Sequence, residues 1–358
     1  MLTSFKMNPA TVFEGQIENA VMEITNRCNL RCPHCASNSG VSRPDEMMLD
    51  EIIHVIRDLK SLGCRVLTLL GGELILRPDW FDVAQAVKAA GIELQLVTNG
   101  ILVDDKVRKK FHALDPETIG VSVDGSTSAS YRAIRGVDGL EHCLRLMDDM
   151  LADGFREVHA ITTFNAKNLQ DFDGFVERFL DTPIVWQIQM AHRGGERFPE
   201  DWLMTREQFK WLVNKVVETC QTYGRRLRLM TMDDFGYFPL TEKLQTVCHY
   251  WNGCQGGRSV IGIRANGDVL PCLSLGDAFI GGNLRARSLI EIWRDPGSFP
   301  GFRDDDISLT GSCRGCPRGH MCRAGCSAMA FSQTGTLTET AFCIRQLERA
   351  EILKVMIP

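Results

Sequence analysis

Six short apolar runs alternate with amphipathic stretches between residues 20 and 222, and this alternation restricts the fold more than any other feature. The amphipathic stretches repeat apolar residues every three or four positions, as helices do, and two of them end on Gly63 and Gly91, which suit helix C-caps. Strand–helix alternation predicts a parallel sheet covered by helices, because successive parallel strands need a crossover connection. The apolar runs are 20–25, 65–70, 92–98, 118–124, 157–164 and 184–190.

Six strand–helix units are fewer than the eight that close a TIM barrel, so we expect an α/β chain with a partial (β/α)6 TIM-type barrel that stays open. Functional groups in such barrels lie at the C-terminal ends of the strands. After residue 246 helical periodicity fades, and cysteine, glycine and short loops dominate, which predicts a small domain held together by metal ligation. The predicted parts are an N-terminal lead (1–19), the barrel (20–224), a linker (225–246) and the small cysteine-rich, loop-rich domain (247–358).

The fourteen cysteines of the chain predict metal or redox chemistry rather than disulfides. No secretory signal and no apolar stretch of bilayer length is present, so we expect a cytoplasmic protein without membrane contact. The net charge of -5, with no extended basic region, also argues against binding of nucleic acid. Cys64, Cys143 and Cys220 are scattered and are interpreted as structural, whereas the other cysteines are clustered.

Cys28, Cys32 and Cys35 lie within eight residues, in a loop that follows the first predicted strand. Four thiolates saturate a [4Fe–4S] cluster, so three leave one iron open to a substrate or cofactor. The Cys-x3-Cys-x2-Cys spacing resembles the signature of the radical S-adenosylmethionine (radical SAM) enzymes. The resemblance implies that SAM chelates the open iron and is cleaved by one electron to methionine and a 5′-deoxyadenosyl radical. The alternatives are a zinc site, or cysteines buried as small apolar side chains.

Two further features near the start of the chain resemble parts of the SAM site in this family. Gly71-Gly72-Glu73, directly after the second strand, resembles the GGE motif that holds the amino group of SAM, although Leu74 stands where a proline usually follows. His34 occupies the position at which the family usually places an aromatic ring against the adenine. The alternatives are a common glycine turn and a loop histidine without a contact.

The resemblance also implies contacts with SAM from the ends of the later strands. Ser122 and Asp124 are two apart on a strand and therefore face the same way, and the guanidinium of Arg135 would match the geometry of a carboxylate. The alternatives are a turn at Asp124-Gly125, a solvated Arg135 and core packing for Ile161. The implied contacts are Asn99 at the barrel mouth, Ser122 and Asp124 on the ribose hydroxyls, Arg135 on the SAM carboxylate and Ile161 on the adenine.

The eight cysteines after residue 247 resemble the SPASM domain, an iron–sulfur extension of radical SAM enzymes. Seven match its spacing, and the eighth, Cys248, matches the extra ligand of members with two fully ligated clusters. Residues 262–272, between two ligands, are expected to form a hairpin around Asn266-Gly267. Zinc ribbons use similar cysteine pairs, but zinc carries no electrons. The resemblance assigns one auxiliary [4Fe–4S] cluster to Cys248, Cys254, Cys272 and Cys326, and the other to Cys313, Cys316, Cys322 and Cys343.

The resemblance covers roughly residues 20–345 and implies SAM and three [4Fe–4S] clusters as cofactors. We expect an oxidoreductase that abstracts hydrogen from a peptide or protein and forms a crosslink or related modification, while the auxiliary clusters accept an electron. Only about twenty residues precede the first strand, so we expect either that a separate leader-binding protein recognises a leader peptide or that the substrate needs no such recognition. The expected electron donor is a protein such as flavodoxin or ferredoxin. Leu273, where sulfatase-maturing members carry an aspartate base, argues against a sulfatase substrate.

Three alternatives stay open on the sequence. The substrate could be a small molecule, such as a tetrapyrrole or another cofactor precursor. A pure iron–sulfur electron carrier would cleave no SAM, and the segments at 71–73 and 122–125 argue against it. A zinc-dependent nucleic-acid-binding protein conflicts with the acidic net charge.

Overall fold

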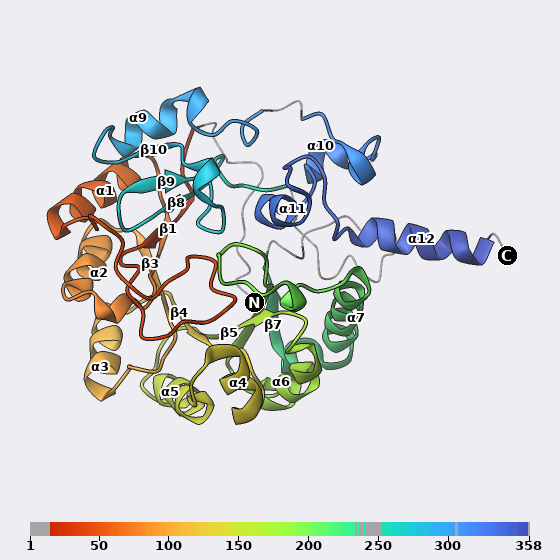
Figure 1. Ribbon diagram of the computed structural model, residues 1–358. Helices are drawn as coiled ribbons and strands as arrows, with labels where there is room; N and C mark the ends of the chain where they lie inside the picture. Colours follow the sequence, from red (N-terminus) through yellow and green to blue (C-terminus); the bar gives the residue numbers. More distant parts are fainter. Residues whose placement is uncertain (1–14, 233–234, 236–239, 241–252, 305–306, 357–358) are drawn as a thin grey trace.

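One ten-stranded sheet joins the N-terminal and C-terminal parts of the chain (Figure 1). The computed structural model describes residues 15–232, 235, 240, 253–304 and 307–356. Eight neighbouring strands, from β8 through β1 to β7, are parallel, and the sheet runs in the order β10-β9-β8-β1-β2-β3-β4-β5-β6-β7, so β7 and β10 end it and the barrel does not close. The strands are β1 (Asn19–Glu23), β2 (Val66–Leu70), β3 (Glu93–Thr98), β4 (Thr118–Ser122), β5 (Val158–Phe164), β6 (Val185–Met190), β7 (Arg228–Thr231), β8 (Val260–Ile263), β9 (Asp268–Leu270) and β10 (Gly282–Asn283).

Helices form a ring outside the parallel strands, as the alternation of the sequence predicts (Figure 1). The first two end as expected, since Gly63 and Gly91 follow them with φ angles of +89° and +66°. In the part of the chain that the structure describes, no helix has the length and apolar character needed to cross a membrane. The helices are α1 (Leu49–Ser61), α2 (Trp80–Ala89), α3 (Asp105–Leu114), α4 (Ser128–Arg135), α5 (Leu140–Ala152), α6 (Phe172–Phe179), α7 (Arg206–Tyr223), α9 (Leu289–Arg294), α10 (Gly319–Cys322), α11 (Ser327–Thr334) and α12 (Ile344–Met356).

The six predicted strands are confirmed, and β7 is a seventh that the sequence did not predict. Residues 228–231 fall in the predicted linker, but they pair in parallel with β6, with Arg228 opposite Val185. All four residues of β7 are only half-buried, and arginines precede and begin the strand, so no apolar run marks it. Arg228 is held instead by an ion pair of 2.6 Å to Glu157, the residue directly before β5.

The C-terminal region is attached to the barrel through β1. The predicted hairpin is confirmed: β8 and β9 are antiparallel, and Gly267 in the turn between them has a φ of +86°. β8 then pairs in parallel with β1, with Asn19 opposite Val260 and Met22 opposite Ile263. The cysteine-rich region therefore extends the same sheet that carries the barrel.

The apolar core lies between the outer face of the sheet and the helices. Trp186 on β6 shows the packing: it is fully buried, and Phe172, Phe175 and Phe179 of α6 lie with ring centroids 5.1, 5.5 and 6.0 Å from its own. Its indole Nε1–H donates to Thr162 Oγ1 at 3.0 Å, so the single polar atom of the ring is satisfied. This aromatic cluster fixes the outer side of β5 and β6 and leaves their other face toward the barrel interior.

We expect Trp186→Ala to lower the free energy of unfolding by about 3–5 kcal/mol, because it removes a fully buried ring and leaves a cavity. Trp211→Ala is the comparison: Trp211 is 40% exposed and its ring lies 6.2 Å from that of Phe172, so its loss should cost roughly half as much or less. Denaturant unfolding followed by circular dichroism measures both. Equal destabilisation by the two substitutions would contradict the assigned core.

Candidate active site

Nine of the twelve residues predicted for the barrel site line one cavity of about 150 Å³. The cavity lies where the ends of β2, β3 and β4 meet the loop after β1, at the edge where barrel enzymes place their functional groups. Glu73, Asp124 and Ile161 are outside the lining. The nine lining residues are Cys28, Cys32, His34, Cys35, Gly71, Gly72, Asn99, Ser122 and Arg135.

The two glycines after β2 are required by contact with the cysteine loop. The backbone N–H groups of Gly72 and Glu73 donate to Thr25 O at 2.7 Å and Arg27 O at 2.8 Å. A Cβ atom at residue 71 would lie 2.5 Å from Thr25 O, and one at residue 72 would lie 2.5 Å from Arg27 O. Only glycine permits this approach, so the turn after β2 supports the loop that carries the three cysteines.

Glu73 points into the protein and positions the end of β3. Its buried carboxylate accepts from Thr98 Oγ1 at 2.8 Å and from the backbone N–H of Asn99 at 2.7 Å. Burial raises the pKa of Glu73 to about 7, and these hydrogen bonds oppose the increase. Asn99 then bridges the site, since its Nδ2 donates to Asn29 Oδ1 at 2.8 Å and lies 3.8 Å from Cys28 Sγ.

Arg135 and Asp124 form a buried ion pair beside the cavity. Arg135 Nε lies 2.6 Å from Asp124 Oδ2, and His34 Nε2 lies 3.2 Å from the same oxygen. The backbone N–H of Thr163 donates to Asp124 Oδ1 at 2.7 Å. Burial acts to raise the pKa of Asp124, but Arg135 and then His34 outweigh it and hold that pKa at about 2. The side chain of Arg135 is only 11% exposed, so it is not a solvated surface arginine.

Local structure at both ends of α4 places Arg135 at the cavity. The helix begins with a capping box in which Thr127 Oγ1 accepts from the N–H of Ser130. Asp171 holds the preceding turn through hydrogen bonds from Ser126 Oγ at 2.6 Å and Ser130 Oγ at 2.8 Å. Gly136, with a φ of +79°, ends the helix directly after Arg135.

Hydrogen-bond donors surround the three cysteine sulfurs. The N–H groups of Leu30 and Ser39 donate to Cys28 Sγ at 3.3 Å and Cys35 Sγ at 3.4 Å, and Arg135 Nη1 lies 3.6 Å from Cys32 Sγ. Burial, followed by the charges of Glu73 and the other two cysteines, raises the pKa of the Cys28 thiol to about 11. A bound metal cation would stabilise three adjacent thiols of this kind in their thiolate form. The set of three sulfur donors therefore fits an iron–sulfur cluster.

Comparison with known families agrees with this geometry. The sequence model of the Radical SAM superfamily matches residues 22–179, which contain the three-cysteine loop and all the cavity residues. The model of the SPASM iron–sulfur cluster-binding domain matches residues 254–317. The chain is a radical SAM enzyme with a SPASM domain.

Individual relatives of this radical SAM/SPASM enzyme act on different substrates. It is 27% identical over 317 residues to mycofactocin maturase MftC of Mycobacterium ulcerans, covering 86% of this chain and 82% of that protein. It is 29% identical over 335 residues to the AdoMet-dependent heme synthase of Methanosarcina barkeri, covering 90% of this chain and 95% of that protein. The solved structure of Streptococcus suis SuiB bound to S-adenosylmethionine has the same fold, with a TM-score of 0.75 and 16% identity over 93% of this chain and 78% of that one.

Three SPASM cysteines of one predicted set influence one another electrostatically. Burial is the main cause that raises the pKa of the Cys343 thiol to about 11, and the charges of Cys313 and Cys316 add to it. Gly315, with a φ of +69°, allows the turn in which the N–H of Cys316 donates to Cys313 O at 3.2 Å. The fourth predicted member, Cys322, ends α10.

The other SPASM set is described only in part. Cys272 and Cys326 pack against the apolar core, and Cys254 Sγ lies 3.5 Å from where a Cβ of Gly256 would be. Cys248 lies outside the described residues. Arg323, Ala324 and Gly325, between the ligands of the two sets, all have positive φ angles of 54°, 65° and 82°. Two consecutive non-glycine residues in this region are strained, as is typical of backbone held around a functional group.

Some residues at the site were missed by the sequence analysis. Trp202 stacks on His34, with ring centroids 6.2 Å apart and planes at 21°. The loop after β6 packs on the cysteine loop, since Arg197 Nη2 donates to Ser39 O at 2.9 Å. In the same loop, His192 Nε2 lies 3.0 Å from Ser274 O in the SPASM domain. The pair Gly194-Gly195 was the available signal, because adjacent glycines after a strand indicate close backbone approach.

Ile161 is placed by packing against β4. Its side chain is 8% exposed and fills the space above Gly120, where any Cβ would overlap it. Core packing, the alternative considered from the sequence, therefore accounts for its position without a ligand. Its contact with adenine stays a prediction.

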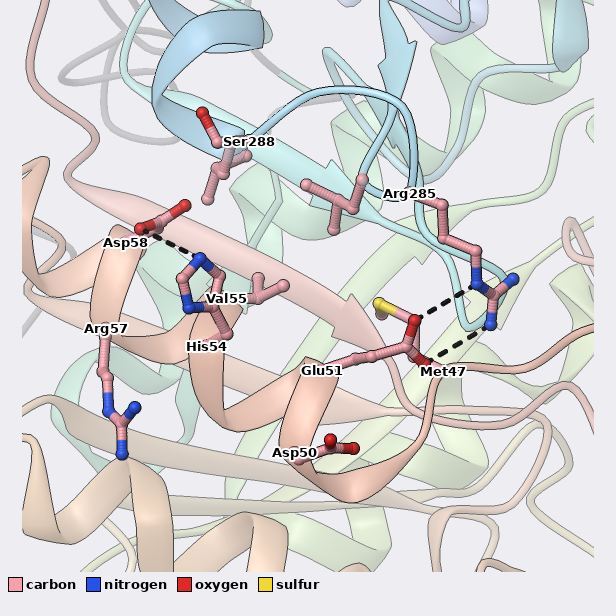
Figure 2. A pocket seen from close by; sticks show the side chains of 11 residues that line it. Met47, Asp50, Glu51, His54, Val55, Arg57, Asp58, Arg285 and Ser288 are labelled. Carbon is pink, nitrogen blue, oxygen red and sulfur yellow. Dashed lines mark hydrogen bonds and ion pairs between the residues drawn. The ribbon is translucent and has the colours of Figure 1, made fainter.

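A larger cavity, of about 360 Å³, lies between α1 and the segment that joins β10 to α9 (Figure 2). No cysteine lines it. Glu51 of α1 and Arg285 face each other across it in an ion pair of 3.2 Å (Figure 2). Arg285 Nη1 also donates to Asp45 O at 2.7 Å. These contacts tie the SPASM domain to the barrel at a place remote from the cluster ligands.

We expect Asp124→Asn to lower the free energy of unfolding of the metal-free protein by about 3–5 kcal/mol, because Arg135 is then left buried without a counter-charge. Since the pKa of Asp124 is held at about 2, its carboxylate is charged throughout, and the loss should be equal from about pH 5 to about pH 8. The matched control is Asp173→Asn, which removes an exposed ion pair with Lys215 of 2.9 Å and should cost less than about 1 kcal/mol. Urea unfolding measures the free energy lost in each variant. Equal losses in the two variants would contradict the buried network around Asp124.

Proposed function

We propose that this enzyme binds a [4Fe–4S] cluster on Cys28, Cys32 and Cys35, binds SAM beside it, and abstracts a hydrogen atom from a peptide or protein substrate. The observation that carries the proposal is the single cavity that contains all three thiols together with Gly71, Gly72, Asn99, Ser122 and Arg135. Residues from four separate segments converge there, which core packing alone would not require. The product would be a crosslink or a related oxidative modification.

The residues of the cavity have distinct tasks in this proposal. When bound, the cluster would supply the electron that cleaves SAM to methionine and a 5′-deoxyadenosyl radical. Arg135 presents a positive charge that a carboxylate of SAM would pair with, and Asp124 fixes its orientation through the 2.6 Å contact. Glu73 holds the backbone of Asn99 at the cavity wall. His34, held by Asp124 and Trp202, presents a ring surface to an adenine.

Two findings support a peptide or protein as the substrate. Among the relatives, MftC is a maturase, and a structure of SuiB holds its precursor peptide SuiA. The sheet of this chain ends at β7 and β10 without closing the barrel, and an open barrel admits a larger substrate than a closed one. A separate leader-binding protein and a flavodoxin or ferredoxin as reductant belong to the same proposal.

A tetrapyrrole substrate is the second candidate, because one observation favours it. The match to the heme synthase of Methanosarcina barkeri covers 95% of that protein, whereas the match to the maturase covers 82% of its length. Identity is also slightly higher, at 29% against 27%. These differences are small, so the substrate has to be decided by experiment.

The proposal includes two auxiliary [4Fe–4S] clusters in the SPASM domain, which lies at 247–358 after the barrel and linker. Each would be ligated by four cysteines, and a fully ligated cluster is suited to electron transfer rather than to binding a substrate. They would accept the electron that the substrate radical loses. A cytoplasmic location is part of the proposal, since a reducing compartment keeps thiols available for metal.

Anaerobic reconstitution should load about twelve irons per chain if all three clusters form. Cys32→Ala should reduce this to about eight and abolish formation of 5′-deoxyadenosine, because it removes one of only three ligands. Iron analysis and chromatography of the SAM products measure the two results. Formation of 5′-deoxyadenosine by the variant would overturn the site assignment, and about four irons in the wild type would overturn the auxiliary clusters.

The two substrate candidates predict different results when enzyme, SAM and dithionite are combined. If the substrate is a peptide, a short peptide encoded beside the gene should lose two hydrogens by mass spectrometry on crosslinking. If it is a tetrapyrrole, the purified enzyme should carry a pigment with a porphyrin absorption band that changes on turnover. Catalytically inactive Cys32→Ala is the control for both assays. If the pigment is converted and the peptide is not, the tetrapyrrole replaces the peptide as the proposed substrate.

A further inference from the structure

Two glutamines on β6, Gln187 and Gln189, face the interior of the barrel. Trp186 and Ile188, which alternate with them along the strand, are fully buried, and Trp186 packs against α6 on the outer side of the sheet. Successive side chains of a strand point to opposite faces, so both glutamines point inward. Both are only half-buried, and their exposed parts therefore lie on the inner face. We refer to these two residues as the glutamine pair.

The strand register places the glutamine pair beside the cavity of the active site. Gln187 lies opposite Ile161 of β5, which lies opposite Ser122 of β4, a residue that lines the cavity. Neighbouring strands are about 4.8 Å apart, so the Cα atoms of Gln187 and Ser122 are separated by roughly 10 Å. Gln189 lies two residues further toward the C-terminal end of β6, the edge of the sheet at which the cavity is found.

Each glutamine uses one end of its carboxamide to bond to the barrel wall. Gln189 Nε2 donates to Thr163 Oγ1 at 2.9 Å, and Gln187 Oε1 lies 3.0 Å from Nδ1 of the buried His159. Within the described part of the chain, Gln187 Nε2 and Gln189 Oε1 have no hydrogen-bond partner, and neither atom is enclosed by protein. One donor and one acceptor are therefore left open to the barrel interior.

Thr163 connects the glutamine pair to the charged groups of the active site. Its side chain accepts from Gln189, and its backbone N–H donates to Asp124 Oδ1 at 2.7 Å. Asp124 in turn contacts Arg135 and His34. The position of the pair is therefore fixed relative to the cavity proposed for SAM.

A donor and an acceptor two residues apart match the backbone of an extended peptide. Such a peptide presents an N–H and a C=O on one side at every second residue, and its repeat of roughly 7 Å equals the spacing of residues 187 and 189. Gln187 Nε2 is suited to donate to the C=O, and Gln189 Oε1 is suited to accept from the N–H. A carboxylate, such as a propionate of a tetrapyrrole, accepts hydrogen bonds only and would leave Gln189 Oε1 unpaired.

We propose that the glutamine pair is a subsite that binds backbone amide groups of the substrate and holds an extended peptide segment beside SAM. The inference rests on the proposed function, because it takes the substrate to be a peptide or protein and specifies how the barrel recognises it. Both glutamines bind and orient the substrate, and neither exchanges a proton or an electron with it.

Gln95 on β3 is a third inward-facing glutamine, and its position makes it a control. It lies on the same face as Val97, which lines the cavity, and its Oε1 accepts from Thr68 Oγ1 at 3.0 Å. Gln95 lies opposite Thr118 of β4, four residues before Ser122. At about 3.3 Å per residue it is therefore roughly 13 Å deeper in the barrel than the level of Gln187.

The experiment compares two probes, N-acetyl-trialanine amide and acetyl-trilactate methyl ester, in which oxygen replaces every backbone N–H. NMR line broadening of the methyl signals, titrated with the reconstituted enzyme and SAM under anaerobic conditions, measures the affinity for each probe. The wild type should bind the amide about tenfold or more tightly than the ester, because the ester leaves the buried end of Gln189 without a donor.

The two glutamines should respond differently to substitution. Gln189→Met removes the acceptor and should reduce the preference for the amide to about twofold or less. Gln187→Met should weaken both probes by a similar factor, about five- to tenfold, and keep the preference, because both probes retain the carbonyl groups that it binds. A merely structural role of either residue would not change the ratio of the two affinities.

The matched control is Gln95→Met, which should alter neither affinity by more than about twofold. Circular dichroism and iron content establish that each variant is folded and loaded, and the alanine substitutions replace any methionine variant that is not. Equal wild-type affinity for the two probes, a preference that survives Gln189→Met, an equal effect of Gln95→Met, or no binding of the amide would overturn the proposal. Failure of the proposed function is seen separately, as absence of dithionite-driven SAM cleavage in the wild type.

Discussion

Backbone contact between the loop after β1 and the turn after β2 is the constraint on which the active site depends. Two N–H groups, of Gly72 and Glu73, donate to the oxygens of Thr25 and Arg27, and no side chain larger than hydrogen fits at residues 71 and 72. The contact extends the parallel pairing of β1 and β2 beyond the regular strands. It therefore fixes the start of the cysteine loop before any metal is bound, and it turns the carboxylate of Glu73 toward the end of β3.

A second layer of the site consists of charges that stabilise one another. Asp124 is buried and the side chain of Arg135 is only 11% exposed, so leaving either charge without the other would cost several kcal/mol, roughly as measured for broken buried pairs. Their opposite charges lie 2.6 Å apart, His34 and Thr163 also contact Asp124, and the Nη1 of Arg135 lies beside Cys32. Asp124 thus contributes to the cavity through the groups that it holds, although it does not line the cavity itself.

Sequence patterns predicted the strands and the cysteine loop well because each leaves a local signal. The predicted runs at 65–70 and 184–190 agree with the bounds of β2 and β6 to within one residue at each end. β7 leaves no such signal, since its residues are half-buried and an arginine begins it. The pairing of β1 with β8 was also beyond prediction, because it joins segments about 240 residues apart and neither pattern specifies its partner.

For the site, residue types were predictable but their orientation was not. The family resemblance implied Asn99 and Ser122, at strand ends, and Arg135 further on as site residues, and all three line the cavity. The ion pair of Arg135 with Asp124 depends on the cap of α4 and on Asp171, which is 36 residues further along the chain, so the sequence alone did not indicate it. Long-range packing of this kind is set by the fold as a whole.

The position of β1 in the sheet has a consequence for electron transfer. Its C-terminal end leads to Cys28, and its neighbour β8 leads through the hairpin to Cys272. The hydrogen-bonded register of β1 with β8 therefore fixes where the segments leading to Cys28 and Cys272 begin. The distance between these two cysteines does not depend on the linker between the domains. A relay between clusters requires a constant distance, and a shared sheet maintains it better than a docking interface between separate domains, which ordinarily permits relative motion.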